Sequence, residues 1–416
     1  MKICCADCQR EATWGAMGRC DACGGILQPQ YADDEIAGLS GVDPGPGIDR
    51  YAAALPVGQD IPSLGEGDTP LVASRRLGSI LGLKHLFFKN EGRNPSGAFK
   101  DRAGVMAAAL ALDAGKKGLV TASSGNSAAA ASAYCAAAGL GCLILLEPGN
   151  PPAKLRQALA TGAVVLPVEG IFSHGQNNTR DMIMDVAHLL DFYPAFVWAP
   201  VNPYILEGIK TISYEVVSRL PGPPDVVVCP VGGGDMLAAQ WRGYQELRRV
   251  GIIDRLPRMV AVQSTAAAPL WDAFRSGADR VGTIDHPHSK LSGLNVPFTG
   301  EHALAAVRSS GGTVVAITDE EAFAMQASLA RTEGVWAEPA SCAPVAALPR
   351  LLEDGLLDPD ERVVCLLSGA GWKDTELARV VAEEVNRAEA VPFDAETVSR
   401  EAGIRLLGRW DGGSPA

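Results

Sequence analysis

Short apolar segments alternate with helical patterns along most of this chain, from residue 86 to residue 390. The apolar segments have the length and composition of buried strands, and they cover 118–121, 142–146, 164–167, 225–229, 259–263, 313–317 and 363–367. Helical patterns lie between them, for example at 126–138, 152–161, 207–220 and 320–332. Strands that alternate with helices form parallel sheets that are covered on both faces. The alternation therefore predicts an α/β protein built on parallel sheets.

The chain has 416 residues, enough for roughly two or three domains with cores of their own. A segment rich in glycine and proline at 41–47 indicates a boundary after the N-terminal region. We predict a cysteine-rich module at 1–34, a linker that leads into the main fold at 35–85, a smaller α/β domain at 86–190, a larger α/β domain at 191–390 and a C-terminal extension at 391–416. The extension has the weakest periodicity, and we expect its end to fray.

The charge balance is acidic, with a formal net charge of -12 at pH 7. Such a balance disfavours a general nucleic-acid or anionic-membrane surface. No apolar run approaches the roughly 20 residues that a membrane span needs, and the N-terminus opens with cysteines rather than with a signal-peptide core. We therefore expect a cytoplasmic protein that binds neither nucleic acid nor membrane.

Five of the ten cysteines lie in the first 23 residues, and four of them form two C-x2-C pairs, Cys5 with Cys8 and Cys20 with Cys23. Four thiolates at this spacing can surround a structural zinc ion, which predicts a zinc-ribbon-like module. Cys4 is an alternative ligand to Cys5, and four unmetallated cysteines are the alternative to a zinc site. A closed four-cysteine site serves folding rather than chemistry. The other five cysteines stand in apolar segments and are expected to be buried thiols.

Lys100 stands between an apolar run at 86–88 and a helical pattern at about 103–114, in the segment N-P-S-G-A-F-K-D-R over 94–102. A ligand can reach a side chain at such a junction, although a plain basic loop residue is the simple alternative. The positive end of a helix disfavours a cation. That field lowers the pKa of an amine and makes it a better nucleophile toward a carbonyl.

Two further turns each follow a candidate strand and precede a helix. The first is polar and consists of Ser123, Ser124, Gly125, Asn126 and Ser127. It is either a helix cap or a carboxylate site. The second consists of Gly232, Gly233, Gly234, Asp235 and Met236. Consecutive glycines at a helix N-terminus can close around a phosphate. A phosphate would repel the Asp235 carboxylate, so we expect this side chain to turn outward or to cap the helix.

These segments together resemble threonine synthase and its relatives, which are pyridoxal-phosphate enzymes of the tryptophan-synthase-β fold type. The segment 94–102 resembles N-P-T-G-S-F-K-D-R of that family, and 123–127 resembles its S-S/T-G-N-T/S. The segment 333–341 resembles E-G-x-x-x-E-P-A-S, and 367–374 resembles T-G-H-G-L-K-D. The cysteine-rich start is also similar, except that Gln9 stands where a glycine is usual.

The resemblance implies two parallel-sheet α/β domains and an N-terminal zinc-ribbon-like module. It implies that Lys100 carries pyridoxal 5'-phosphate as a Schiff base, that the glycine turn holds the phosphate, and that a hydroxyl faces the pyridine nitrogen. Cofactor binding then falls to Phe99, Lys100, Asn126, Gly232, Gly233, Gly234, Asp235, Met236 and Ser368. Substrate binding falls to Ser123, Ser124, Gly125, Ser127 and Lys154.

The stretch 199–211 departs from its counterpart in threonine synthases, N-S-V-N-P-Y-R-I-E-G-Q-K-T. There the arginine and the first polar pair grip the phosphate of O-phosphohomoserine. Here Ile205 replaces the arginine, and Ala199 and Pro200 replace the polar pair. An isoleucine cannot donate to a phosphate, for which arginine is the usual partner. We therefore expect a substrate that need not carry this phosphate, unless Lys154 or Arg156 supplies the missing cation.

The resemblance implies a homodimeric lyase that acts on a small amino acid, with Lys100 as the base that removes the α-proton. The nearest named reaction converts O-phosphohomoserine to threonine and phosphate. A serine/threonine dehydratase or a β-replacement synthase on the same scaffold is the alternative. The cysteine module and the K-D-R sequence favour the first reading, and the lost arginine favours the second. The net acidity and Lys100 argue against a non-catalytic, nucleic-acid-binding protein.

Overall fold

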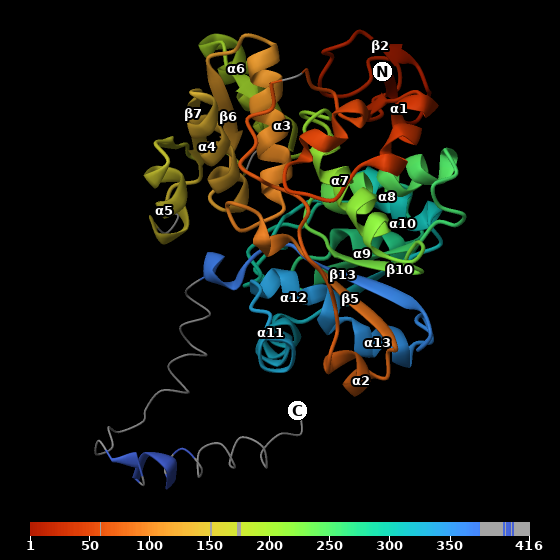
Figure 1. Cartoon of the computed structure of the whole chain (residues 1–416). Helices are drawn as coiled ribbons and strands as arrows, with labels where there is room; N and C mark the ends of the chain where they lie inside the picture. The colour runs from red at the N-terminus through yellow and green to blue at the C-terminus, as the bar shows by residue number, and fades with distance from the viewer. Residues whose placement is uncertain are drawn as a thin grey trace. The chain divides into compact units, whose positions relative to one another are not determined.

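Three β-sheets organise residues 1–373 (Figure 1). The computed structural model describes residues 1–58, 60–149, 152–172 and 176–374 and a few later positions (394, 395, 397–400 and 402), without the side chains of 152–154 and 176–178. Residues 374–416 form a separate unit. The predicted extension at 391–416 lies mostly outside the described residues.

The N-terminal sheet is small and antiparallel. It has the order β2-β1-β3, with β1 at Lys2–Cys5, β2 at Glu11–Ala12 and β3 at Leu27–Gln30. The loops beside these strands carry the cysteine pairs. A short helix, α1 (Asp33–Ala37), follows the sheet.

The second sheet is four-stranded and parallel, with the order β8-β7-β6-β9. Its strands are β6 (Gly118–Ala122), β7 (Gly141–Leu146), β8 (Val164–Pro167) and β9 (Tyr193–Pro194). Its helices are α3 (Lys100–Asp113), α4 (Asn126–Ala138), α5 (Pro152–Ala160) and α6 (Gln176–Leu190). Helices α3 and α4 approach so closely that a Cβ on Gly104 would lie only 3.2 Å from the Ala130 side chain. Small residues on both helices permit this packing.

The third sheet has the order β12-β11-β10-β13-β5-β4, and only β4 runs antiparallel to its neighbour. Its strands are β4 (Leu71–Ala73), β5 (His85–Asn90), β10 (Val226–Pro230), β11 (Arg258–Ser264), β12 (Thr313–Ile317) and β13 (Arg362–Leu367). Its helices are α2 (Leu77–Leu81), α7 (Leu206–Arg219), α8 (Asp235–Arg249), α9 (Pro269–Ser276), α10 (Glu301–Ser309), α11 (Asp319–Glu333), α12 (Pro339–Ala346) and α13 (Leu348–Glu353).

Alternate side chains of the central strands pack into two separate cores. Val227 and Cys229 of β10 pack with residues of α7, α8 and α10. Val226 and Val228 of the same strand pack with residues of α11, α12 and α13. Figure 1 shows these helix groups on opposite sides of β5 and β13. The predicted parallel sheet with two covered faces is thus confirmed.

Most predicted elements are found within two residues of their expected ends, but two differences concern the site. The helix expected from about residue 103 begins at Lys100, which lies in its first turn. Strand β5, placed at the start of the smaller domain at 86–190, pairs with β13 of the larger sheet instead. Local sequence does not specify which strand will be a neighbour. Within the described part of the chain, every helix is too short or too polar to cross a membrane.

Candidate active site

The loop before Lys100 is tied to the end of strand β13. The N–H of Phe99 donates to the carbonyl oxygen of Ser368 at 2.9 Å, and Ala98 forms a β-bridge with Gly369. Because β5 and β13 are parallel neighbours, the loops after both strands meet at the same edge of the sheet. Ligands of open α/β sheets bind at the carboxyl ends of the strands. The contact thus brings together two predicted segments that are far apart in sequence.

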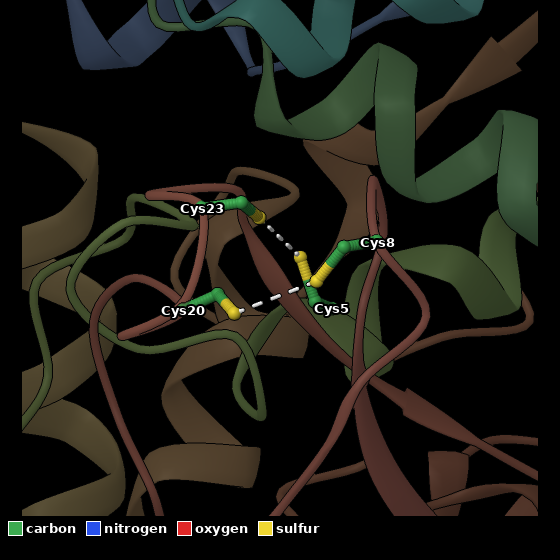
Figure 2. A group of neighbouring side chains, drawn as sticks. All are labelled: Cys5, Cys8, Cys20 and Cys23. Atoms are coloured by element: carbon green, nitrogen blue, oxygen red, sulfur yellow. Dashed lines mark hydrogen bonds between the residues drawn. The ribbon is translucent and has the colours of Figure 1, made fainter.

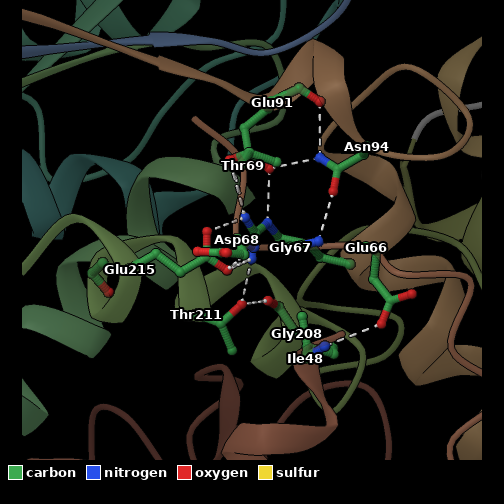
Figure 3. A network of polar contacts seen from close by, with 12 residues as sticks. Ile48, Glu66, Gly67, Asp68, Thr69, Glu91, Asn94, Gly208, Thr211 and Glu215 are labelled. Carbon is green, nitrogen blue, oxygen red and sulfur yellow. Dashed lines mark hydrogen bonds and ion pairs between the residues drawn. The ribbon is translucent and has the colours of Figure 1, made fainter. Parts of the chain in front are cut away.

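A buried network of charges anchors the first turn of α3 (Figure 3). The Arg102 guanidinium donates to Glu91 at 2.7 Å and to Glu215 at 2.6 Å. The Lys89 ammonium donates to Glu215 at 2.5 Å. Burial raises the pKa of Glu215, but Arg102 and Lys89 outweigh it and hold that pKa well below its usual range. Because Glu91 follows β5 and Glu215 lies on α7, the network fixes the turn that carries Lys100.

The amine of Lys100 is held in a setting that favours its neutral form. Burial lowers the pKa of Lys100 from 10.5 to about 8, and the carboxylate of Asp235 opposes this shift. The Nζ atom lies 4.7 Å from the centre of the Phe99 ring. This atom forms no hydrogen bond or ion pair with the residues that the structure describes. An uncommitted amine with a lowered pKa is suited to attack a carbonyl carbon and to accept a proton.

The lowered pKa predicts how Lys100 reacts with pH. Trace acetylation of the apoprotein, followed by peptide mapping, measures the neutral fraction of each lysine. We expect labelling of Lys100 to rise with pH through a midpoint near 8, because only the neutral amine reacts and burial lowers the pKa to that value. A midpoint near 10.5, the ordinary value, would show that the amine is solvated like a surface lysine.

The glycine turn has the shape of an anion cradle. A Cβ on Gly232 would lie 2.7 Å from the carbonyl oxygen of Gly293. Gly234 has φ +98°, and a Cβ there would lie 2.5 Å from the Ala303 methyl carbon. The N–H groups of residues 232–236 have no acceptor among the residues that the structure describes. A series of unpaired N–H groups at the start of α8 binds an anion well.

Asp235 differs from its prediction, because its side chain neither turns outward nor caps α8. It is 5% exposed, and its Oδ1 atom accepts the N–H of Ala199 at 2.8 Å. The same atom lies 3.1 Å from Nε2 of His302. A buried carboxylate requires such donors. Neither partner could be read from the sequence, since Ala199 and His302 lie far from Asp235 along the chain.

The polar turn at 123–127 ends strand β6 and begins α4. The N–H of Gly125 donates to the Ser123 hydroxyl at 3.2 Å. The N–H groups of residues 126–128 find no acceptor in the described part of the chain. The Asn126 amide donates to both carboxylate oxygens of Glu338 at 3.2 Å. The turn therefore has the donors of a second anion cradle, and Glu338 fixes its asparagine.

Ser368 contacts the residues that follow Glu338. Its hydroxyl lies 2.8 Å from that of Ser341, which in turn lies 3.4 Å from Glu338 Oε1. The N–H of Glu338 donates to the carbonyl oxygen of Gly369 at 3.0 Å. Hydrogen bonds thus connect Asn126, Glu338, Ser341 and the end of β13. The segment E-P-A-S signalled this region, but the sequence did not indicate that Glu338 would hold Asn126.

Two predicted features concern the substrate. Ile205, which stands where relatives have an arginine, is fully buried, and Ala199 is 3% exposed. The side chain of Lys154, the expected substrate contact, lies outside the described residues.

The four predicted cysteine ligands converge (Figure 2). The sulfur atoms of Cys5, Cys8, Cys20 and Cys23 all lie within 4.8 Å of one another. Cys5 and Cys23 are 3.4 Å apart, and Cys8 and Cys20 are 3.8 Å apart. Cys4, the alternative to Cys5, is not part of the group. Strand alternation explains this result, because successive side chains of β1 point to opposite faces.

Comparison with known proteins identifies the family. Residues 62–369 match the family described as pyridoxal-phosphate dependent enzyme. The threonine synthase of Methanocaldococcus jannaschii is 38% identical over 377 residues, which are 88% of this chain and 91% of that protein. This chain belongs to the threonine synthase family. The predicted resemblance is confirmed, and the chain is a pyridoxal-phosphate-dependent lyase.

A second relative agrees with this assignment, and solved structures share the fold. The threonine synthase of Methanosarcina acetivorans is 36% identical over 89% of this chain and 91% of its own length. Among solved structures, maize serine racemase has a TM-score of 0.65 at 20% identity and covers 85% of this chain and 98% of its own. The processed form of threonine deaminase isoform 2 from Solanum lycopersicum has a TM-score of 0.65 at 19% identity, over 89% and 93% of the two chains. These neighbours share the fold of this threonine synthase family member.

Proposed function

We propose that this lyase acts on a small amino acid and that Lys100 is the residue to which pyridoxal 5'-phosphate bonds. The observation that carries the proposal is the uncommitted Lys100 amine, whose pKa burial lowers to about 8, at the carboxyl edge of a parallel sheet. Asp235, which follows the glycine turn, acts on the pKa of the same amine. This electrostatic link supports a common pocket for Lys100 and the turn.

The residues present fit the cofactor. The unpaired N–H groups of residues 232–236 suit its phosphate, and the glycines at 232 and 234 let this turn pack closely against Gly293 and Ala303. The hydroxyl of Ser368 is suited to an unprotonated ring nitrogen, and Asn126 to the ring oxygen. When bound, the cofactor supplies a sink for the electrons left at the substrate Cα.

The side chains then divide the remaining work. The Lys100 amine is the base that takes the proton from the substrate Cα, and it can return that proton to another carbon. The N–H groups of residues 126–128, with the hydroxyls of Ser123, Ser124 and Ser127, hold the substrate carboxylate. Glu338 keeps Asn126 in place through two hydrogen bonds of 3.2 Å.

We further propose that the leaving group of the substrate is not a phosphate. Ile205 is fully buried and offers no donor, and the N–H of Ala199 is already bonded to Asp235 at 2.8 Å. The Asp235 carboxylate thus lies beside a position where the family resemblance implies a phosphate-binding group, and like charges repel. A serine/threonine dehydratase or β-replacement synthase is the second candidate, and the same two features favour it.

Turnover of four amino acids by the purified holoenzyme separates these candidates. O-acetyl-L-homoserine converted to threonine supports the proposal, whereas 2-keto acids from L-threonine or L-serine support the second candidate. O-phospho-L-homoserine is the decisive comparison. Its efficient conversion to threonine and phosphate would refute the changed leaving group and leave the lyase assignment intact.

We also propose that the N-terminal module binds zinc through Cys5, Cys8, Cys20 and Cys23. Zinc–sulfur bonds of about 2.3 Å in a tetrahedron place neighbouring sulfurs about 3.8 Å apart. The distances between the sulfurs of Cys5 and Cys23, 3.4 Å, and of Cys8 and Cys20, 3.8 Å, fit this geometry. A Cβ on Gly25 would lie 2.8 Å from the Cys5 sulfur, so the glycine leaves room for the group.

Matched cysteine variants test the metal site. We expect Cys5→Ser to lose the bound zinc, because three thiolates hold the ion far more weakly than four. Cys4→Ser is the control, since Cys4 is the neighbouring cysteine, is 2% exposed and lies outside the group. Metal analysis of both purified proteins should find zinc only in the control. Equal zinc contents would show that Cys5 is not a ligand.

We propose a cytoplasmic protein that binds no nucleic acid and, on the family resemblance, a homodimer. The domain division at 34, 85, 190 and 390 is likewise a proposal. The net charge of -12 supports the absence of a nucleic-acid partner. Light scattering on the purified protein tests the dimer, with a molar mass of 43.4 kDa expected for the monomer.

A further inference from the structure

The cysteine module contacts a loop at residues 198–205, here called the 198–205 loop. The N–H of Gly18 donates to the carbonyl oxygen of Val201 at 3.2 Å. The N–H of Gly15 donates to the hydroxyl of Tyr204 at 2.9 Å. Two backbone groups of the module are thus bonded to the loop that precedes α7.

Tyr204 is packed inside the module itself. Its side chain is 2% exposed and belongs to the same small core as Cys5 and Cys20. The ring of Trp14 packs edge-on against it, with the ring centres 5.1 Å apart. The residues that hold the cysteine group together therefore also enclose a side chain of the loop.

The 198–205 loop is braced internally, so a shift at one end is passed to the other. The N–H groups of Val201 and Asn202 donate to the carbonyl oxygen of Trp198 at 2.9 Å and 3.1 Å. The Asn202 side chain accepts the N–H of Tyr204 at 3.0 Å and donates to the carbonyl oxygen of Pro194 at 2.8 Å. All of these groups are buried, and buried hydrogen bonds are costly to break.

The other end of the loop contacts the glycine turn. The N–H of Ala199 donates to Asp235 Oδ1 at 2.8 Å. A Cβ on Gly233 would lie 3.8 Å from Cδ1 of Trp198, so the indole ring borders the turn. Contacts therefore run without a gap from Trp14 to Gly233.

A second set of contacts reaches the same carboxylate. Arg19 of the module lies 3.6 Å from Glu301 at the start of α10. The next residue, His302, lies 3.1 Å from Asp235. The exposed Arg19–Glu301 pair is weak, so the route through Tyr204 is the stronger of the two.

We propose that the cysteine module positions the 198–205 loop against the glycine turn and that Tyr204 is the positioning residue that links them. The inference rests on the proposed function, in which the turn holds the cofactor and the loop borders the substrate. Fixing Cys5 and Cys20 in one metal site holds the core that encloses Tyr204. The module then contributes to substrate binding without supplying a group that touches the substrate.

Two variants test this proposal in the full-length holoenzyme. Trp14→Ala removes a ring that is 48% exposed, and Tyr204→Phe removes only the hydroxyl that accepts the Gly15 N–H. Tyr244→Phe is the matched control, because its buried hydroxyl has no hydrogen-bond partner among the described residues. Hydrogen–deuterium exchange of the peptide that spans 198–206 reports on the loop directly, without any need for turnover.

We expect amide exchange in this peptide to be about three- to ten-fold faster in Trp14→Ala and Tyr204→Phe than in Tyr244→Phe. KM for the amino acid that is turned over should rise by a similar factor, with kcat within about two-fold. Exchange at control rates in both variants would overturn the proposal, as would faster exchange spread evenly over the chain. An enzyme inactive toward all four amino acids would refute the proposed function instead. The exchange result would still test the contact between the module and the loop, because it does not depend on turnover.

Discussion

Replacing Lys100 with alanine is expected to reduce turnover by at least about 10³-fold, because a positioned base and nucleophile contribute this much or more. The same variant should lack the absorbance near about 410–420 nm that a lysine-bound cofactor gives. Burial lowers the pKa of the Lys100 amine to about 8, and the amine has no hydrogen bond to the described residues. It is therefore free to act as base and nucleophile, and alanine supplies no group for either role. Steady-state kinetics and an absorbance spectrum of the purified variant check both effects.

The control for this variant is Lys117→Ala, whose side chain is 76% exposed and lies just beyond α3. It should retain the spectrum and the turnover of the unmodified enzyme. Turnover within ten-fold of normal in the Lys100→Ala protein would show that Lys100 is not the base or the nucleophile.

Replacing Arg102 with leucine should lower the free energy of unfolding by about 3–5 kcal/mol, because it removes the guanidinium that two buried carboxylates share. Glu91 and Glu215 are at most 1% exposed and accept short hydrogen bonds from this guanidinium. Urea denaturation followed by circular dichroism measures the change. Since the network carries the turn that begins at Lys100, the variant should also lose activity at temperatures where it remains folded.

The matched control is Lys84→Ala, which breaks an ion pair with Asp360 at the surface. Solvent screens such pairs, so its unfolding midpoint should match that of the unmodified protein. An Arg102→Leu protein with an unchanged midpoint would show that the network is neutralised in another way, for example by protonation of a glutamate.

Features that depend on a few consecutive residues were predictable from the sequence. The triple glycine is required by close contacts at Gly232 and by the positive φ of Gly234, which no other residue adopts readily. The strand–helix alternation predicted the fold class because burial on two faces imposes it. The cysteine spacing predicted the group of four sulfurs, because each C-x2-C pair places two thiols close together within four residues.

Features that depend on partners far along the chain could not be predicted in this way. Asp235 was expected to turn outward or to cap its helix, but it is buried because Ala199 and His302 supply donors to it. Glu338 bonds to Asn126 across 212 positions of sequence, and no local pattern specifies such a pair. The start of α3 at Lys100 likewise depends on the distant carbonyl oxygen of Ser368.

The cofactor linkage itself is open to direct measurement. Borohydride reduction of the holoenzyme makes a lysine-bound pyridoxyl group permanent, and peptide mapping by mass spectrometry then locates it. The group is expected on the peptide that contains Lys100 and on no other. A pyridoxyl group on a different lysine, or none in a protein that turns over its substrate, would contradict the assignment of Lys100 and of the pocket built around it.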